Sequence, residues 1–139
     1  MYHIHDSEIY SYAVDFENGR LRISARYYHD NTHSDADIIF SGYHTHLFNN
    51  EQKRNIVFDI TKCNPVRFYE RERALLEENR AYHWPIPYKT PNTKTELLQF
   101  LQKNEYTVFE ISASQGLFGW IIATEMNIVP QTPPPPQER

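Results

Sequence analysis

Two pairs of histidines have a spacing that could hold a metal ion. His3 and His5, and likewise His44 and His46, are two residues apart, which places both rings of a pair on one side of a β-strand. Imidazole nitrogen is a common zinc ligand, and Glu51 could add a carboxylate to the second pair. A zinc site needs three or four convergent ligands, and the sequence does not establish that convergence. A metal site at His44, His46 and Glu51 is therefore an alternative interpretation, beside surface or interface histidines.

Nucleophilic catalysis has two weak candidates. Cys63 stands just before a predicted helix, where the helix N-terminus would lower the thiol pKa, and His46 or His83 could act as its base. A lone cysteine is more often an inert packing residue. Ser114 lies close to a glycine, but the segment after it is predicted as a strand, so it does not form a nucleophile elbow. We therefore predict no catalytic residue and no cofactor.

The most unusual segment is rich in aromatic residues and proline, and it spans residues 82–88 (Tyr-His-Trp-Pro-Ile-Pro-Tyr). Tyrosine and tryptophan dominate the energetic centres of protein interfaces, so an exposed segment of this kind predicts a binding surface. In the alternative interpretation, Trp84 and Ile86 simply cover one end of the core, and for Trp84 we favour that role. The candidate binding residues are Tyr82, His83, Trp84 and Tyr88.

The elements that would position these residues begin with a β-hairpin. Two β-prone runs, residues 8–16 and 20–28, flank Asn18-Gly19, the dipeptide favoured in a two-residue type I′ turn. That turn predicts that Val14 faces Ile23. One face of the hairpin is then predicted to be core, and it contains Tyr10, Tyr12, Val14, Phe16, Leu21, Ile23, Ala25 and Tyr27. The other face, with Asp15 and Arg22, is predicted to meet water.

The rest of the chain alternates between strands and helices. Strands are predicted at residues 36–43, 55–61, 106–112 and 117–129, with Ile56, Phe58 and Ile60 pointing inward, while residues 42–53 are ambiguous and allow a short helical turn. Asn64 and Pro65 begin one helix, which must end before Trp84. A capping box, Thr93 with Glu96, predicts a second helix that ends near Asn104. The order predicts an α+β fold: a mainly antiparallel sheet that starts with the hairpin and is packed on one face by two helices.

Composition limits the classes of function. The 139 residues suit a single domain over residues 1–129, followed by a proline-rich tail at 130–139 that is predicted to be disordered. With 18 acidic and 14 basic residues the net charge is −4, which argues against a general nucleic-acid binder. No apolar stretch is long enough to span a bilayer, residues 1–6 do not resemble a secretory signal, and the one cysteine excludes an internal disulfide. We expect a cytoplasmic protein with no membrane partner.

Several phrases together resemble a family of small uncharacterised cytosolic proteins of Gram-positive bacteria. The resemblance reaches to about Ile128, and its phrases are His5-Asp6-Ser7-x-Ile9, Phe40 with His46-x-Phe48, residues 55–60, Tyr82-x-Trp84-Pro85 and Ser112-x-Ser114-x-Gly116-Leu117-x-Gly119-Trp120. Proteins of this general character include immunity proteins, which neutralise a toxin made by the same cell. The resemblance carries no catalytic signature. We therefore expect a non-enzymatic domain that binds a protein partner; a homodimer through exposed strand edges is a further arrangement.

Overall fold

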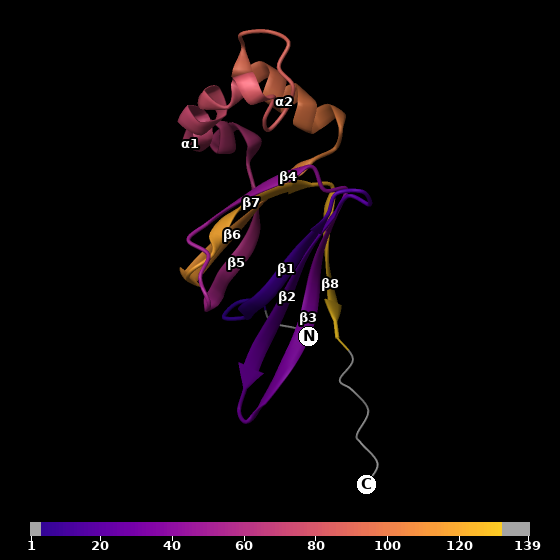
Figure 1. The fold of residues 1–139 in the computed structure, drawn as a ribbon, viewed down its shortest axis with the longest axis vertical. Helices are drawn as coiled ribbons and strands as arrows, with labels where there is room; N and C mark the ends of the chain where they lie inside the picture. The colour runs from indigo at the N-terminus through magenta and orange to yellow at the C-terminus, as the bar shows by residue number, and fades with distance from the viewer. Residues whose placement is uncertain (1–3, 132–139) are drawn as a thin grey trace.

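The computed structural model describes residues 4–131 of the chain and consists of one β-sheet with two helices at one end (Figure 1). The α+β class and the N-terminal hairpin predicted from the sequence are confirmed. The elements, in chain order, are β1 (Glu8–Asp15), β2 (Arg20–His29), β3 (Thr32–Ser41), β4 (Thr45–Asn49), β5 (Asn55–Cys63), α1 (Pro65–Glu78), the 3₁₀ turn η1 (Arg80–Tyr82), α2 (Thr93–Lys103), β6 (Thr107–Gln115), β7 (Phe118–Ala123) and β8 (Glu125–Pro130).

The sheet is antiparallel throughout the described strands and folds into two halves. Its order is β4-β7-β6-β5-β1-β2-β3-β8. We call β1, β2, β3 and β8 the hairpin half, and β4 to β7 with the helices the helical half. The chain passes from one half to the other at two connections: β3 leads into β4, and β7 leads into β8 across Thr124. Strands β1 and β5 also join the halves, through the pairs Glu8–Ile56 and Ile9–Asn55.

The main core lies between the two halves. Phe40 of β3 meets Phe109 of β6 in an edge-to-face contact with ring centroids 5.3 Å apart. The core is completed by apolar residues from both sides: Ile9, Leu21, Ile23, Ala25, Ile38, Val57, Ile60, Ile111, Leu117, Ile121 and Ala123. Burial of this apolar surface is the main force that holds the halves together.

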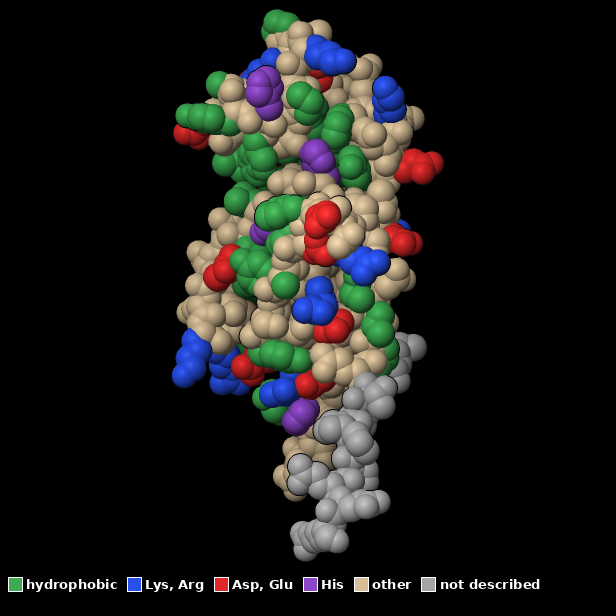
Figure 2. Space-filling view, turned by 45° about the vertical axis from the view of Figure 1, so that its right-hand side comes forward, with side chains coloured by type: hydrophobic (Ala, Val, Ile, Leu, Met, Phe, Trp, Pro, Cys, Tyr) green, Lys and Arg blue, Asp and Glu red, His purple; other side chains and the backbone are tan. Residues whose placement is uncertain are grey.

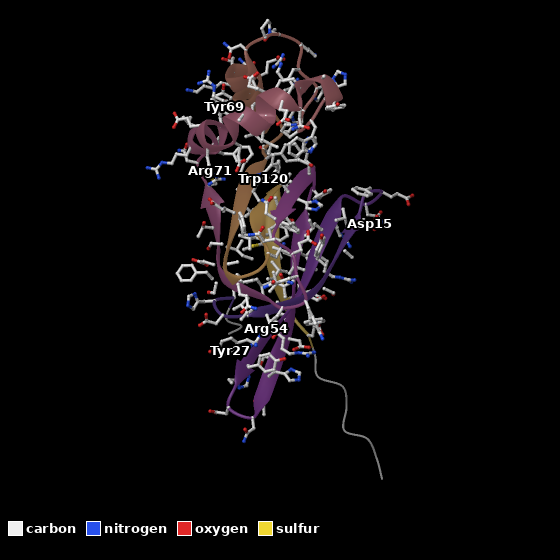
Figure 3. The ribbon with its side chains drawn as sticks, turned by 60° about the vertical axis from the view of Figure 1, so that its left-hand side comes forward. Asp15, Tyr27, Arg54, Tyr69, Arg71 and Trp120 are labelled. Carbon is white, nitrogen blue, oxygen red and sulfur yellow. The ribbon has the colours of Figure 1, made fainter. Side chains whose placement is uncertain are left out.

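The helices cover only the outer face of the helical half. Successive residues of a strand point to opposite faces, so Ile121 enters the main core while Trp120 and Ile122 face the helices. Trp120 is 2% exposed, and its ring centroid lies 5.0 Å from that of Phe68 of α1. Figure 3 shows Trp120 and Tyr69 at the helical end of the molecule. A second core, separate from the first, therefore fixes α1 and α2.

The start of each helix is determined by an asparagine. Asn64 accepts hydrogen bonds from the backbone N–H groups of Val66 and Arg67, which confirms the predicted first cap. The predicted capping box of the second helix is wrong. Asn92 is the N-cap and accepts from the N–H of Thr95, whereas the Glu96 carboxylate reaches back to the backbone N–H groups of residues 89 and 90.

The register of the hairpin differs from the predicted one by two residues. Asp15 pairs with Arg20 and Val14 pairs with Leu21, so the turn contains four residues rather than two. The reason is the Asp15 side chain, which accepts hydrogen bonds from the backbone and the side-chain amide of Asn18 and stabilises a longer turn. Phe16, predicted to be core, lies in this turn and is 80% exposed. The predicted exposure of Asp15 and Arg22 is confirmed.

Bulges explain two further errors in the predicted core. A register shift between Ile9 and Ser11 turns Tyr10 outward, where it is 44% exposed. Two shifts between Ile56 and Asp59 likewise bury Val57 and leave Phe58 52% exposed. Each bulge adds one residue to a strand and exchanges the faces of the residues beyond it, a change that regular alternation does not predict.

The ambiguous segment at residues 42–53 and the predicted strand at residues 117–129 lie side by side where the sheet bends. Residues 45–49 form strand β4, not a helical turn, and pair with β7. A side chain at Gly119 would collide with the carbonyl oxygen of Leu47, so glycine is needed for this close approach. The predicted strand at 117–129 is broken at Thr124, whose N–H and hydroxyl both donate to the Ser41 carbonyl. Strand β8 includes Pro130, which pairs with Ala36, while residues 132–139 of the predicted tail lie outside the described residues.

Candidate functional site

His44 belongs to the helical end. It precedes β4, and its Nε2 donates a hydrogen bond to the carbonyl of Pro85. Its ring lies 5.0 Å from that of Phe100 and 5.2 Å from that of Tyr106, measured between centroids. Its role in this structure is to tie the bend between β3 and β4 to the aromatic–proline segment.

His46 lies in a different cluster. Its Nδ1 shares a 2.7 Å hydrogen bond with the Tyr43 hydroxyl, and its ring centroid lies 4.7 Å from that of Phe48. Burial holds the pKa of His46 below its usual value, while the Glu51 charge opposes the shift. The prediction that His44 and His46 share one side of a strand is wrong, because the chain bends just before β4.

The carboxylate of Glu51 is already hydrogen-bonded to a tyrosine. The Tyr12 hydroxyl donates to both carboxylate oxygens of Glu51, at 2.9 and 3.0 Å. Burial, together with the hydrogen bond to this carboxylate, raises the pKa of Tyr12. Among residues 4–131, no three histidine, cysteine or acidic side chains are grouped as a metal ion would require. His44, His46 and Glu51 therefore do not converge as the metal interpretation predicted.

Cys63 lacks an activating environment. Burial is the main cause of a raised thiol pKa, although the nearby Arg71 acts in the opposite direction. Arg71, a residue of α1, is itself paired with Glu110, at 2.8 Å between Nη1 and Oε1; Figure 3 labels it at the helical end of the molecule. The expected lowering of the thiol pKa by the helix N-terminus is wrong in direction, because burial outweighs it.

The aromatic–proline segment divides into covered and exposed residues. Trp84 covers the second core as predicted: its Nε1–H donates to the Thr45 hydroxyl at 2.9 Å, and its ring lies 5.6 Å from that of Trp120. Ile86 is also buried, with 2% of its surface exposed. Tyr82, by contrast, is 78% exposed, and the neighbouring His83 is exposed as well.

Tyr88 is half-buried beneath a cation. The Arg80 guanidinium lies 4.4 Å from the centroid of the Tyr88 ring. Burial raises the pKa of Tyr88 to about 12. Its hydroxyl has no hydrogen-bond partner among the described residues. Tyr88 therefore packs within the helical end rather than projecting from it. Of the four predicted binding residues, Tyr82 and His83 are the exposed ones.

A groove runs between the aromatic–proline segment and α2. We call it the α2 groove; its volume is about 820 Å³, and it is lined by Ile86, Pro87, Lys89, Glu96, Gln99, Phe100, Gln102, Lys103 and Asn104. Figure 2 shows hydrophobic side chains gathered at this end of the molecule, with basic side chains beside them. Sequence reasoning missed the contribution of α2, although the polar residues Gln99, Gln102 and Lys103 on a helix with an apolar opposite face were a signal for an exposed surface.

The walls of the α2 groove are held in place by polar contacts. Glu96 accepts from the N–H groups of Lys89 and Thr90, at 2.7–2.9 Å and 2.7 Å, which fastens the loop to α2. Arg80 donates to the Thr93 hydroxyl at 2.7 Å and to the carbonyl of Thr90. A surface fixed in this way loses little conformational entropy when it binds.

Comparison of the chain with protein-family models, with curated proteins and with solved structures found no match. Within residues 4–131, no helix is both long and apolar enough to cross a membrane. The candidate site is thus defined by its own geometry: an apolar floor, a polar rim and an adjacent exposed tyrosine.

Proposed function

We propose that this protein is a non-enzymatic binding domain, and that it binds a protein partner through the helical-end surface, defined as Tyr82, His83 and the α2 groove. The observation that carries the proposal is the groove itself, which has an apolar floor at Pro87 and Phe100 and a rim of amides and lysines. An apolar centre with a polar rim is the usual anatomy of a protein interface. Neutralisation of a partner, as immunity proteins do, is its most concrete form.

The side chains considered above for metal binding or nucleophilic catalysis support this proposal, because each is either hydrogen-bonded within the fold or not activated. His44 donates to Pro85, Glu51 accepts from Tyr12, and the thiol pKa of Cys63 is raised rather than lowered. The rigid walls of the groove favour recognition of a partner of fixed shape. The single cysteine and the mildly acidic net charge of −4 suit the cytoplasmic location that forms part of the proposal.

A pull-down from a lysate of the source organism tests the proposal. The tagged wild-type chain is compared with Tyr82→Ala and with Phe16→Ala, because the two aromatic rings are almost equally exposed, at 78% and 80%. The expected result is a retained protein that is lost or reduced with Tyr82→Ala and kept with Phe16→Ala. If no protein is retained at near-physiological salt, or if both variants retain it equally, the helical-end surface is not the binding site.

A homodimer is a second candidate arrangement, and the edge position of β8 favours it. β8 pairs with β3 on one side, and β3 is its one neighbour among the described strands. Met126 and Ile128 of β8 are only partly buried against the main core. An edge of this kind can pair with the same strand of a second chain. Light scattering that gives the mass of one chain would exclude this arrangement.

A further inference from the structure

The α2 groove is bordered by two lysines that have no acidic partner among the described residues. Lys89 comes from the loop wall and Lys103 from the last turn of α2, and both are exposed. No ion pair among the described residues includes either of them. The chain as a whole carries a net charge of −4. The rim of the groove therefore has locally the opposite sign to the protein as a whole.

The one carboxylate that lines the groove, Glu96, offsets only part of the charge of these two lysines. Glu96 directs its oxygens to the backbone N–H groups of the loop and to the Thr90 hydroxyl, at 2.7–3.2 Å. These hydrogen bonds lower the pKa of Glu96, and the charge of Arg80 acts in the same direction. Glu96 keeps its negative charge but directs it to the loop, so the groove lining carries two lysines against one carboxylate, and both lysines face solvent.

The remaining lining of the groove is neutral. Gln99 and Gln102 present amides, and the end of α2 is capped by Asn104, whose side-chain amide donates to the Phe100 carbonyl at 2.8 Å. The apolar part of the lining is the exposed Pro87, the half-buried ring of Phe100 and Ile86, which is almost fully buried. An apolar side chain placed on this floor would be flanked by a cation on each wall.

We propose that the α2 groove binds an acidic, extended segment of the protein partner, with one apolar side chain on the floor at Pro87 and Phe100 and carboxylates beside Lys89 and Lys103. This inference rests on the proposed function, because it names the partner segment that the helical-end surface recognises. The carrying argument is charge complementarity, which selects partners and speeds encounter. Two lysines on a chain of net negative charge are too few for a phosphate backbone, which makes nucleic acid the weaker occupant.

Short labelled peptides of defined charge test the inference by fluorescence polarisation. Peptides of about nine residues carry a central leucine flanked by glutamates, by glutamines or by lysines. The wild-type chain is expected to bind the glutamate peptide about tenfold more tightly than the glutamine peptide and to bind the lysine peptide least. This preference should weaken as salt concentration rises. Equal affinity for the three peptides, or no binding of the glutamate peptide, would overturn the inference.

Matched charge-reversal variants locate the effect. K89E/K103E changes both groove lysines, and K53E/K62E makes the same change in net charge at two exposed lysines outside the groove. The first variant is expected to lose about tenfold in affinity for the glutamate peptide and to gain affinity for the lysine peptide. The second is expected to stay within about twofold of wild type. An equal loss in both variants would mean net charge alone, which contradicts a site in the groove.

The pull-down separates this inference from the proposed function. If a retained partner depends on Tyr82 but binds K89E/K103E as well as wild type, the helical-end surface binds a partner whose segment is not acidic, and only the inference fails. If the retained molecule is nucleic acid or a second copy of this chain, the assignment of the groove to an acidic partner segment is wrong. If K89E/K103E releases a partner that K53E/K62E keeps, the inference is supported.

Discussion

The two halves of this molecule expose aromatic residues in very different settings. In the hairpin half, Phe16 is 80% exposed on a tight turn, and its ring centroid lies 6.3 Å from that of Tyr43. In the helical half, Tyr82 is 78% exposed in the segment that continues into one wall of the α2 groove. Exposure of an aromatic ring alone therefore does not define a binding surface. The helical end differs in the size of its groove, which is about 820 Å³, whereas the pocket lined by Arg20, Arg22 and Ile39 in the hairpin half is about 250 Å³.

The outer faces of the halves differ in the same way. In the hairpin half, polar side chains satisfy one another: Arg26 binds both carboxylate oxygens of Asp35, and Ser24 donates to Asp37 at 2.9 Å. In the helical half, the outer face of the sheet is covered by helices whose far side carries Lys103 without an acidic partner among the described residues. Arg20 and Arg22 of the hairpin half are also exposed and in no ion pair among the described residues, so the larger groove, rather than the free charges, sets the helical end apart.

The largest expected effects concern the two cores. Trp120→Ala should lower the free energy of unfolding by about 3–5 kcal/mol, because Trp120 is 2% exposed and packs on Phe68 and Trp84. Phe40→Ala should cost a similar amount, about 3–5 kcal/mol, because its ring joins the halves through Phe109. Urea denaturation measures both.

Hydrogen exchange then separates these two variants. Trp120→Ala is expected to speed exchange mainly in α1 and α2, since it removes a side chain of the second core. Phe40→Ala is expected to speed exchange in both halves, since the main core draws on both. Identical exchange patterns in the two variants would contradict the division into two cores.

A smaller effect is expected from Arg26→Ala in the hairpin half. The hydrogen bonds of Arg26 are the main cause of a lowered Asp35 pKa. A carboxylate with a lowered folded-state pKa adds stability above its usual pKa near 3.8, and this stability is lost as pH falls through the folded value. Arg26→Ala should therefore cost about 1 kcal/mol at neutral pH and almost nothing near about pH 2. Denaturant titrations at both pH values measure it. The Arg26 guanidinium also lies 4.8 Å from the centroid of the Tyr10 ring, so a difference that persists in acid would point to the loss of that contact.

A modest pH effect is expected at His46, where β4 faces the hairpin half. Burial lowers the pKa of His46 in the folded chain below 6.5, so the unfolded chain takes up a proton first as pH falls. Stability should therefore decrease as pH drops below about 6.5. His46→Gln should reduce this dependence, whereas Tyr43→Phe, which removes the hydroxyl partner, should keep it. The thermal midpoint measured from pH 7.5 to about 5 decides the matter; an unchanged slope in His46→Gln would count against the assignment.

The smallest expected effect is that of zinc. His44 and His46 belong to separate clusters, and the Glu51 carboxylate is bonded to Tyr12. Addition of zinc to metal-free protein should leave the thermal midpoint unchanged, because a metal ion stabilises a fold only if it binds the folded chain more tightly. A rise that disappears in a His44→Gln/His46→Gln variant would restore the metal interpretation.

Features set by local chemistry could be predicted from the sequence. Asn64 caps its helix because an asparagine followed by proline satisfies free N–H groups whatever lies around it. The existence of the hairpin follows from two β-prone runs around Asn18-Gly19 in the same way. The register does not, because the Asp15 side chain selects a longer turn than the dipeptide alone indicates. The bulges near Tyr10 and Phe58 are set by the pairing with neighbouring strands, which has no signature in the strand itself.

The candidate site could be predicted only in part. The composition of the segment favoured Trp84 as a cover of the core, as the structure has it, but it left open whether Tyr82 is exposed, which the structure shows. The α2 groove could not be foreseen, because it depends on Glu96 bonding the loop rather than capping its own helix. The histidine pair was misjudged for a comparable reason: the bend before β4 breaks the alternation on which the argument depended.

The connection between β5 and β6 has an evolutionary consequence. These strands are antiparallel neighbours, and Cys63 pairs with Val108, so a short turn would be enough to join them. Instead the chain makes an excursion through both helices and the aromatic–proline segment before it returns. Substitution or exchange of that excursion would leave the order of the strands untouched, provided that its replacement again covered Trp120. Descendants of one such scaffold could therefore acquire new partners by varying a single contiguous insert.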